Sequence, residues 1–408
     1  MLKTVPVKQV RLGMFIHELK GAWMDHPFWK SKFLLEDGSD LEKLQQSLIK
    51  HIVIDVAKGL DVVLESGSQG GEQEEVKHLN QMPDLKKTIK PVKRSSAQKE
   101  QAEAARIIKR SKSAVISMFK DARLGKAVNV EAVMPLVEEI SASITRNEGA
   151  LISLVRLKKQ DDYTYMHSVA VCALMTALGK QLELSEAEIR QVGLAGLLHD
   201  LGKSQVPLDV LNKPGALTED EFKQVKLHPQ KGHDLLIQAN INDPITLDVC
   251  LHHHEKIDGS GYPHQLKDTD ISLYAKMGAV CDVYDAVTSN RPYKAGWEPG
   301  ISLKRMAQWA THFDQVVFKA FVKSVGIYPI GSVVILKSGR LAIVIDQSTK
   351  SLTQPIVKVF FSTKAKARIQ VEVLDLSQSS VNDEIIGHET AATWGITNTH
   401  ELWTEEEV

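Results

Sequence analysis

The central part of this 408-residue chain has the apolar spacing of helices. From residue 97 to about 323, apolar residues recur three and four positions apart, which is typical of helices that bury one face. Ser185 and Thr218 each precede a glutamate by three residues, at Glu188 and Glu221, and this spacing predicts capping boxes at two helix starts. We therefore expect a helical domain here.

The N-terminal residues show short strand-like runs instead. Residues 8–11 and 51–56 predict strands and residues 40–50 predict a short helix, so a small α/β module is expected. For the aromatic cluster at residues 23–29, packing into the core is favoured over a partner or ligand surface. Residues 66–98 are rich in Gly, Ser and Gln and then in Lys, which indicates a solvated linker rather than a nucleic-acid-binding segment.

The C-terminal residues again favour strands. The runs 332–336 and 341–345 are rich in β-branched residues, and residues 337–340 between them, with Gly339, predict a hairpin turn. The fold class is therefore mainly α, with a small N-terminal α/β module and a small C-terminal β unit. The expected boundaries are 1–65 for the module, 66–98 for the linker, 99–325 for the helical domain and 326–408 for the β-rich unit and tail.

The composition is that of an ordinary water-soluble protein. Hydrophobic residues make up 43% and charged residues 25%, and the net charge of -1 excludes a strong overall field for nucleic acid or anionic lipid. No segment is apolar over the length of a membrane span, and the first residues do not resemble a signal peptide. Cys172, Cys250 and Cys281 lie in apolar surroundings without metal-binding spacing, so reduced thiols and a cytoplasmic protein are expected.

Histidines are concentrated in the helical stretch, where eight of the 15 fall between Tyr163 and His264. A single histidine in an apolar helix is usually a packed core residue, but several beside aspartates favour a metal site. His199 and Asp200 are adjacent in one helix, which is expected to break at Gly202. Neighbours on a regular helix point about 100° apart, but a carboxylate has two oxygens and can bridge two ions.

A second pair of adjacent imidazoles, His253 and His254, follows further along the chain. Residues 258–263 follow four positions after His254 and contain three glycine or proline positions around Tyr262. Backbone N–H groups of such a loop can approach a ligand, and the Tyr262 side chain can contact a base or a phosphate. An ordinary tight turn is the alternative interpretation of this loop.

Two acidic and two basic residues complete the set of candidate site residues. Asp282 and Asp285 share one face of a helix with apolar neighbours, so one carboxylate can bind a metal while the other orients a ligand. Arg291 and Lys294 follow at once and supply positive charge that the chain as a whole lacks. A phosphate-bearing ligand would need such charge near its binding site.

In order and approximate spacing, these segments resemble the HD-GYP domains, a bacterial family of metal-dependent phosphodiesterases. Each motif is modest alone, and the ordered set is highly specific over about residues 130–324. The N-terminal residues also resemble an uncharacterised module that often precedes HD-GYP domains. The matching motifs are Tyr163-x-x-x-His167, His199-Asp200-Leu201-Gly202-Lys203, His228, His253-His254-Glu255, Gly261-Tyr262-Pro263, Asp282-x-x-Asp285 and Arg291-Pro292-Tyr293-Lys294.

The resemblance implies an all-helical HD-type hydrolase domain and a role for each matching position. Asp200 would bridge two divalent ions, of iron, manganese or zinc, and Lys203 would contact the scissile phosphate. Some members bind a third ion through a glutamate. Tyr163 occupies that position here, so two ions are expected. The implied metal ligands are His167, His199, Asp200, His228, His253, His254 and Asp282, and the implied nucleotide-binding residues are Tyr262, Arg291 and Lys294.

The implied activity is hydrolysis of a cyclic dinucleotide to the linear dinucleotide, with a second cut to mononucleotides left open. Cyclic di-GMP ranks first as substrate because it is the family's usual one, and 3',3'-cyclic GMP-AMP ranks second. Two ions about 3.5–4 Å apart would lower the pKa of a bridging water, so that hydroxide attacks phosphorus in line with the ribose oxygen. The alternatives are a degenerate sensor that binds without cutting, and another HD-type hydrolase. No nucleic-acid polymer is expected as a partner, and residues 97–118 either pack internally or form a homodimer.

Overall fold

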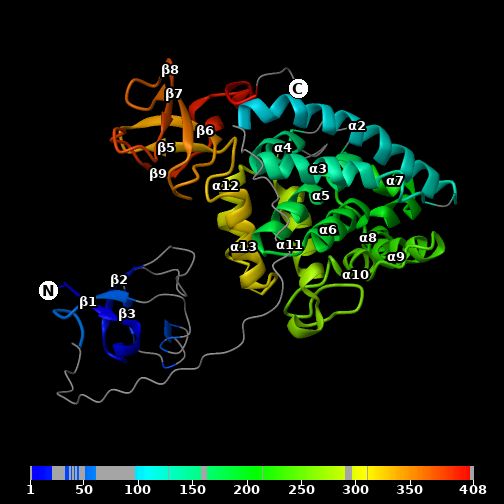
Figure 1. Ribbon diagram of the computed structural model, residues 1–408, viewed down its shortest axis with the longest axis horizontal. Helices are drawn as coiled ribbons and strands as arrows, with labels where there is room; N and C mark the ends of the chain where they lie inside the picture. The colour runs from blue at the N-terminus through cyan, green and yellow to red at the C-terminus, as the bar shows by residue number, and fades with distance from the viewer. Residues whose placement is uncertain are drawn as a thin grey trace, which may run out of the picture. The chain divides into compact units, whose positions relative to one another are not determined.

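The structure, a computed structural model, forms two compact units, Met1–Ile89 and Lys90–Val408. Figure 1 shows both units with their helices and strands labelled. The described residues are 2–20, 33–35, 38, 41, 44–45, 51–60, 97–126, 128–157, 163–213, 215–289, 296–309 and 311–404.

The described residues of the first unit form a small antiparallel sheet with the strand order β1-β4-β2-β3. Its apolar core contains Met14, Ile16, Leu35, Ile52 and Ile54. The strands are β1 (Leu2–Pro6), β2 (Phe15–Lys20), β3 (Phe33–Leu34) and β4 (His51–Asp55).

One of the two strands expected in this unit is confirmed and the other is wrong. The run 51–56 forms β4, but residues 8–11 form no strand. β1 ends at Pro6, which has no backbone N–H, and the 3-10 helix η1 (Val7–Gln9) then turns the chain so that Val7 and Val10 are both buried. The aromatic cluster at 23–29, most of the helix expected over 40–50, and most of the expected linker at 66–98 lie outside the described residues.

Helices make up most of the second unit, and α5 (Tyr163–Gln181) lies at its centre. Every residue from 166 to 179 of this helix is buried, as expected for a helix that is apolar on all sides. The other helices are α2 (Ala97–Arg123), α3 (Met134–Arg146), α4 (Glu148–Val155), α6 (Glu186–Leu198), α7 (Leu208–Leu211), α8 (Glu219–Val225), α9 (His228–Gln238), α10 (Pro244–His252), α11 (Leu273–Thr288), α12 (Pro299–Met306) and α13 (Gln315–Val325).

The predicted helix starts are confirmed in atomic detail. Ser185 caps α6 by accepting a hydrogen bond from the Glu188 N–H, and the Glu188 carboxylate accepts one from the Ser185 N–H. Thr218 and Glu221 form the same reciprocal pair at the start of α8. Both pairs satisfy backbone N–H groups that have no partner inside the helix.

The C-terminal strands form a five-stranded antiparallel sheet with the order β8-β7-β6-β5-β9. The predicted hairpin joins β5 to β6, and Gly339 in its turn has a φ of +80°, a conformation that favours glycine. The strands are β5 (Val333–Leu336), β6 (Arg340–Asp346), β7 (Ile356–Ser362), β8 (Ala367–Asp375) and β9 (Ile385–His388).

The sheet and the helices share one core. Ile107 and Val115 of α2 belong to the same apolar cluster as Leu341 and Phe360 of the sheet. Figure 1 shows α2 along one side of the helices, with the sheet near one of its ends. None of the described helices is both long enough and apolar enough to cross a bilayer. The predicted mainly α fold, with small sheets at both ends of the chain, is confirmed.

Candidate metal centre

Three helices, α5, α9 and α11, and the turns after α6 and α10 direct imidazole and carboxylate groups to one place inside the second unit. All seven side chains predicted as metal ligands meet there, and six of them are at most 6% exposed. The seventh, His254, is partly exposed and therefore lies nearest to solvent. The residues are His167 on α5, His199 and Asp200 after α6, His228 at the start of α9, His253 and His254 after α10, and Asp282 on α11.

Asp200 lies between two groups of these side chains. Its Oδ1 is 3.2 Å from Nε2 of His228 and 3.8 Å from Nε2 of His253. Its Oδ2 is 3.4 Å from Nε2 of both His167 and His199. The ligand atoms of Asp200, His228, His253 and His254 lie within 4.8 Å of one another, and so do those of His167, His199 and Asp282.

A break in the backbone lets His199 and Asp200 face the same site. The helix expected to continue to Gly202 ends at Leu198, so that part of the prediction is wrong. His199 is the C-cap, Asp200 has φ -99° and ψ 8°, and the 3-10 helix η4 (Leu201–Gln205) follows. This change of backbone direction removes the angular separation that a regular helix would impose on neighbours.

Gly202 allows η4 to pack directly on the start of α9. A Cβ atom at this position would lie 1.9 Å from the carbonyl oxygen of His228 and 2.5 Å from the N atom of Gly232. Both distances are too short for any side chain. The glycine of the motif therefore brings Asp200 and His228 together through backbone packing.

The protonation of three rings is fixed by backbone carbonyl groups. A carbonyl oxygen only accepts hydrogen bonds, so the neutral form of each ring carries its proton on Nδ1 and has a lone pair on Nε2. The Nε2 atoms of these rings face Asp200. The Nε2 atoms of His228 and His253 also face each other, 3.3 Å apart. The Nδ1 contacts are 2.8 Å from His199 to Gly196, 2.8 Å from His228 to Val225 and 3.0 Å from His253 to Val249.

Such an arrangement of lone pairs fits a site for cations. His199 Nε2 and Asp200 Oδ1 are buried, and neither has a hydrogen-bond partner among the described residues. Buried polar atoms without partners are costly, and a cation between lone pairs and a carboxylate removes both the repulsion and the desolvation cost. The side chains present therefore fit divalent cations.

At His253, His254 and Asp200 the electrostatics favour the ionisation states that metal ligands require. Burial lowers the pKa of His254 to about 3, and burial with the neighbouring His254 and His199 holds the pKa of His253 well below its usual value. Burial alone would raise the pKa of Asp200, but Lys203 and His199 outweigh it and hold this pKa far below the ordinary range. The two imidazoles are therefore neutral and the carboxylate is ionised at neutral pH.

Asp282 and Asp285 take different positions, as their spacing on α11 suggested. Asp282 Oδ1 lies 2.9 Å from His167 Nε2 and faces the candidate ions. Asp285 lies on the other side of the ring, with Oδ2 2.6 Å from His167 Nδ1, and also accepts a hydrogen bond from the Ser289 hydroxyl. A carboxylate at this place fixes the orientation and the tautomer of a ligand ring.

Of the four predicted substrate-contacting residues, two lie among the described residues and two do not. Lys203 Nζ lies 2.5 Å from Asp200 Oδ2, and the Tyr262 ring stacks on the His254 ring with centroids 4.6 Å apart. Arg291 and Lys294 lie outside the described residues. Tyr163 begins α5, but its side chain is outside the described part of the chain, so the expected choice between two and three ions stays a prediction.

Glu255 holds the loop that carries Tyr262. It is buried, and its two carboxylate oxygens accept hydrogen bonds from the backbone N–H groups of His264 at 2.7 Å and Leu266 at 3.0 Å. A Cβ at Gly261 would lie 2.5 Å from the Cα of Glu255, so only glycine fits there. The loop is thus a fixed part of the centre.

Lys226 is a neighbour of the centre that sequence reasoning missed. Its Nζ lies 5.3 Å from the centroid of the Tyr262 ring. The only signal for it in the sequence is its position two residues before His228, because α8 otherwise has the charge pattern of an exposed helix.

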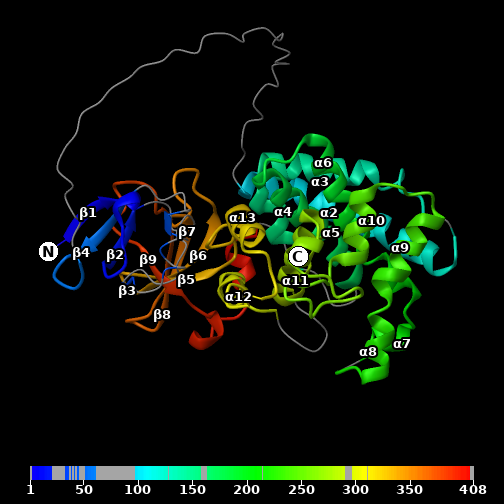
Figure 2. The same ribbon diagram turned by 90° about the horizontal axis from the view of Figure 1, so that it is seen from below.

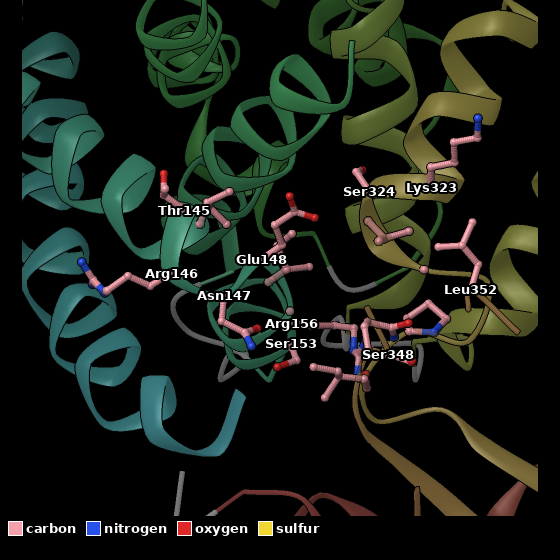
Figure 3. Close-up of a pocket in the computed structure, with 18 residues that line it drawn as sticks. Thr145, Arg146, Asn147, Glu148, Ser153, Arg156, Lys323, Ser324, Ser348 and Leu352 are labelled. Carbon is pink, nitrogen blue, oxygen red and sulfur yellow. The ribbon is translucent and has the colours of Figure 1, made fainter. Parts of the chain in front are cut away.

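A separate cavity of about 280 Å³ lies between α3, α4, α13 and the loops beside β6, and Figure 3 shows it. None of its lining residues belongs to the imidazole cluster. Its polar side chains take part in the fold: Arg146 pairs with Glu100, and Arg156 donates to the carbonyl of Ile330. The geometry therefore favours the imidazole cluster as the functional site.

Family models match both the N-terminal and the helical part of the chain. Residues 145–317 match the model of the HD domain, and residues 2–133 match that of a domain of unknown function, DUF3391. The chain is 51% identical over 405 residues to "Cyclic di-GMP phosphodiesterase PA4108" of Pseudomonas aeruginosa, covering 99% of this chain and 96% of that protein.

Two further relatives match over shorter stretches. "Cyclic di-GMP phosphodiesterase response regulator RpfG" of Xanthomonas campestris is 45% identical over 34% of this chain and 37% of its own length. "3'3'-cGAMP-specific phosphodiesterase 1" of Vibrio cholerae is 31% identical over 43% of this chain and 40% of its own length. With its ordered motifs and a relative that matches over nearly the whole length, the chain belongs to the HD-GYP family of phosphodiesterases.

Proposed function

We propose that this protein is a metal-dependent phosphodiesterase that hydrolyses cyclic di-GMP to its linear dinucleotide. The observation that carries the proposal is the position of Asp200, whose two oxygens face two separate groups of ligand atoms. The substrate choice is supported by the relative that matches almost the whole chain, which is named for cyclic di-GMP. The relative named for 3'3'-cGAMP makes that dinucleotide the second candidate.

We assign two divalent ions to this centre. His228, His253 and His254 would hold one ion, His167, His199 and Asp282 the other, and Asp200 would contact both. Imidazole and carboxylate ligands suit iron, manganese and zinc alike, so this donor set does not select one metal. When bound, such ions neutralise phosphate oxygens and lower the pKa of a water molecule.

The chain's own residues position the substrate around that centre. Lys203 presents its ammonium group beside Asp200 on a side chain that is 20% exposed, so it can reach a phosphate oxygen at the opening of the site. Tyr262 covers His254 and offers a ring face to a base or a hydroxyl group to a phosphate. Asp285 keeps the Nε2 atom of His167 directed at the centre.

A cytoplasmic location is part of the proposal, because a cytoplasmic messenger is the expected substrate and Cys172, Cys250 and Cys281 are buried free thiols. Dimerisation stays a prediction. The buried face of α2 includes Ala104, Ile107 and Val115, so at least that face packs internally.

The test is product analysis with both cyclic dinucleotides. Metal-loaded protein is incubated with cyclic di-GMP or 3',3'-cyclic GMP-AMP, and the products are separated by chromatography beside a metal analysis of the same sample. We expect linear dinucleotide from cyclic di-GMP, and none with Asp200→Ala. Binding without turnover would instead identify a sensor. Linear nucleotides are tested in parallel, and turnover of these alone would identify another HD-type hydrolase.

A further inference from the structure

A line of side-chain contacts leads away from the candidate metal centre. Tyr262 stacks on His254, and Lys226 Nζ lies 5.3 Å from the centroid of the Tyr262 ring. The same ammonium group lies 4.9 Å from the centroid of the Phe222 ring, whose residue is 46% exposed. The contacts therefore run from a candidate metal ligand, through a tyrosine and a lysine, to an aromatic ring in solvent.

The backbone fixes this line relative to the centre. Lys226 is the C-cap of α8, and its N–H donates to the carbonyl of Phe222 at 2.9 Å. His228, only two residues later, begins α9 and is fully buried against Asp200. Figure 2 shows α7 and α8 projecting from the body of the helices, below α9 in that view. Lys226 is therefore held at the edge of the site by the residues that build the site.

The chemistry of this edge fits the part of a cyclic dinucleotide that is not being cut. Such a molecule carries two phosphodiesters and two bases, and one metal centre with Lys203 can engage only one phosphodiester at a time. An ammonium group binds a phosphate as a point charge, and an exposed aromatic ring stacks on any base. Lys226 and Phe222 supply these two groups side by side.

We propose that Lys226 and Phe222 form a second substrate subsite, in which Lys226 binds the uncut phosphodiester and Phe222 stacks on a base. The proposal rests on the proposed function, because it requires a cyclic dinucleotide as substrate. It gives α8 a role in substrate affinity and none in the chemical step. Lys223 on the same helix provides a matched control, since it is 72% exposed and its Nζ pairs with Asp220 at 2.9 Å.

The test compares Lys226→Gln, Lys226→Arg, Phe222→Leu and Lys223→Gln with the wild type. Steady-state kinetics are measured on cyclic di-GMP and on bis(4-nitrophenyl) phosphate, a phosphodiester without a second phosphate. Lys226→Gln should raise KM for cyclic di-GMP about tenfold, with kcat unchanged within about twofold, because one charge-assisted contact is lost. Phe222→Leu should also raise KM, whereas Lys226→Arg and Lys223→Gln should stay near the wild type. Activity on the simple diester and metal content should be equal in all five proteins.

Equal KM values for Lys226→Gln and Lys223→Gln would overturn the subsite. Loss of metal, or an equal loss of activity on the simple diester, in Lys226→Gln would overturn it as well, since both indicate a structural role. A metal-loaded wild type that does not cut cyclic di-GMP contradicts the proposed function instead. Calorimetric titration of cyclic di-GMP into the same proteins then decides the subsite: a weaker Kd in Lys226→Gln and Phe222→Leu but not in Lys223→Gln supports it, and an unchanged Kd in Lys226→Gln or no binding to the wild type overturns it.

Discussion

His167 and Asp285 form a buried pair in which the ring Nδ1 and the carboxylate Oδ2 are 2.6 Å apart. The pair leaves Nε2 of the ring, on its other side, 2.9 Å from Asp282 and 3.4 Å from Asp200. One carboxylate on α11 thus faces the candidate ions while the other, one turn away, sets the direction of a ligand ring.

Replacing Asp285 by asparagine should therefore weaken metal binding without removing a ligand. A neutral amide holds the ring less firmly, and its NH2 group can donate to Nδ1 and favour the other tautomer, so we expect about a 10- to 100-fold loss of metal affinity. Titration with a metal-sensitive dye measures this change. Asp270→Asn, on the exposed 3-10 helix η5 (Asp268–Asp270), is the control. Equal metal affinity in the two variants would show that Asp285 does not orient His167.

A methyl group at Gly202 should separate Asp200 from His228. The Cβ atom of Gly202→Ala would lie 1.9 Å from the His228 carbonyl oxygen, so either η4 or the start of α9 has to move. Forcing atoms into a packed region costs about 1–3 kcal/mol, and the shift should also lower the number of bound ions. Thermal unfolding and metal analysis measure the two effects. In Gly387→Ala the new Cβ atom would lie 3.7 Å from a side-chain atom of Ile335, which is an ordinary contact, so that variant should behave as the wild type.

Glu255→Gln should disturb the substrate loop and leave the ions bound. The carboxylate accepts hydrogen bonds from two backbone N–H groups, and an amide can accept at only one of its two positions. Loss of a hydrogen bond to a charged group should lower the free energy of unfolding by about 1.5–3 kcal/mol. Because Tyr262 lies on this loop, KM should rise. Unfolding in urea, metal analysis and kinetics check the three parts, and loss of metal with unchanged KM would contradict the assignment.

Removing the ions with a chelator should lower Tm and preserve the helices. The ions bind the folded state, so a free metal concentration 1,000-fold above Kd should stabilise that state by about 4 kcal/mol. The apolar cluster around α5 does not depend on them, and far-ultraviolet circular dichroism should therefore stay nearly constant. Scanning calorimetry before and after chelation measures the shift in Tm. A Tm that does not respond to chelation and reloading would mean that no ion binds in this cluster.

The periodicity of the sequence predicts most of the helices and strands, but it does not predict the geometry of the candidate metal centre. The capping boxes at Ser185 and Thr218, the hairpin at Gly339 and the shared face of Asp282 and Asp285 all follow from local spacing, and the structure confirms them. These features depend on residues within a few positions of one another. Local spacing therefore predicts them well.

Features that depend on the backbone direction or on distant segments were missed. The end of α6 at Leu198 lies within an apolar run that would also suit a continuing helix, and only the packing of Gly202 on α9 explains the break. Lys226 becomes meaningful only when the loop with Tyr262 is folded against it. The strand predicted over 8–11 does not form, because a turn can bury Val7 and Val10 as well as a strand can.

The central claim is that Asp200 is shared by two ions, and anomalous X-ray diffraction from crystals of the metal-loaded protein tests it most directly. We predict two anomalous peaks, one beside each Asp200 oxygen at about 2.0–2.2 Å, with His228, His253 and His254 around one and His167, His199 and Asp282 around the other. A single peak, or two peaks of which one does not contact Asp200, would contradict the account.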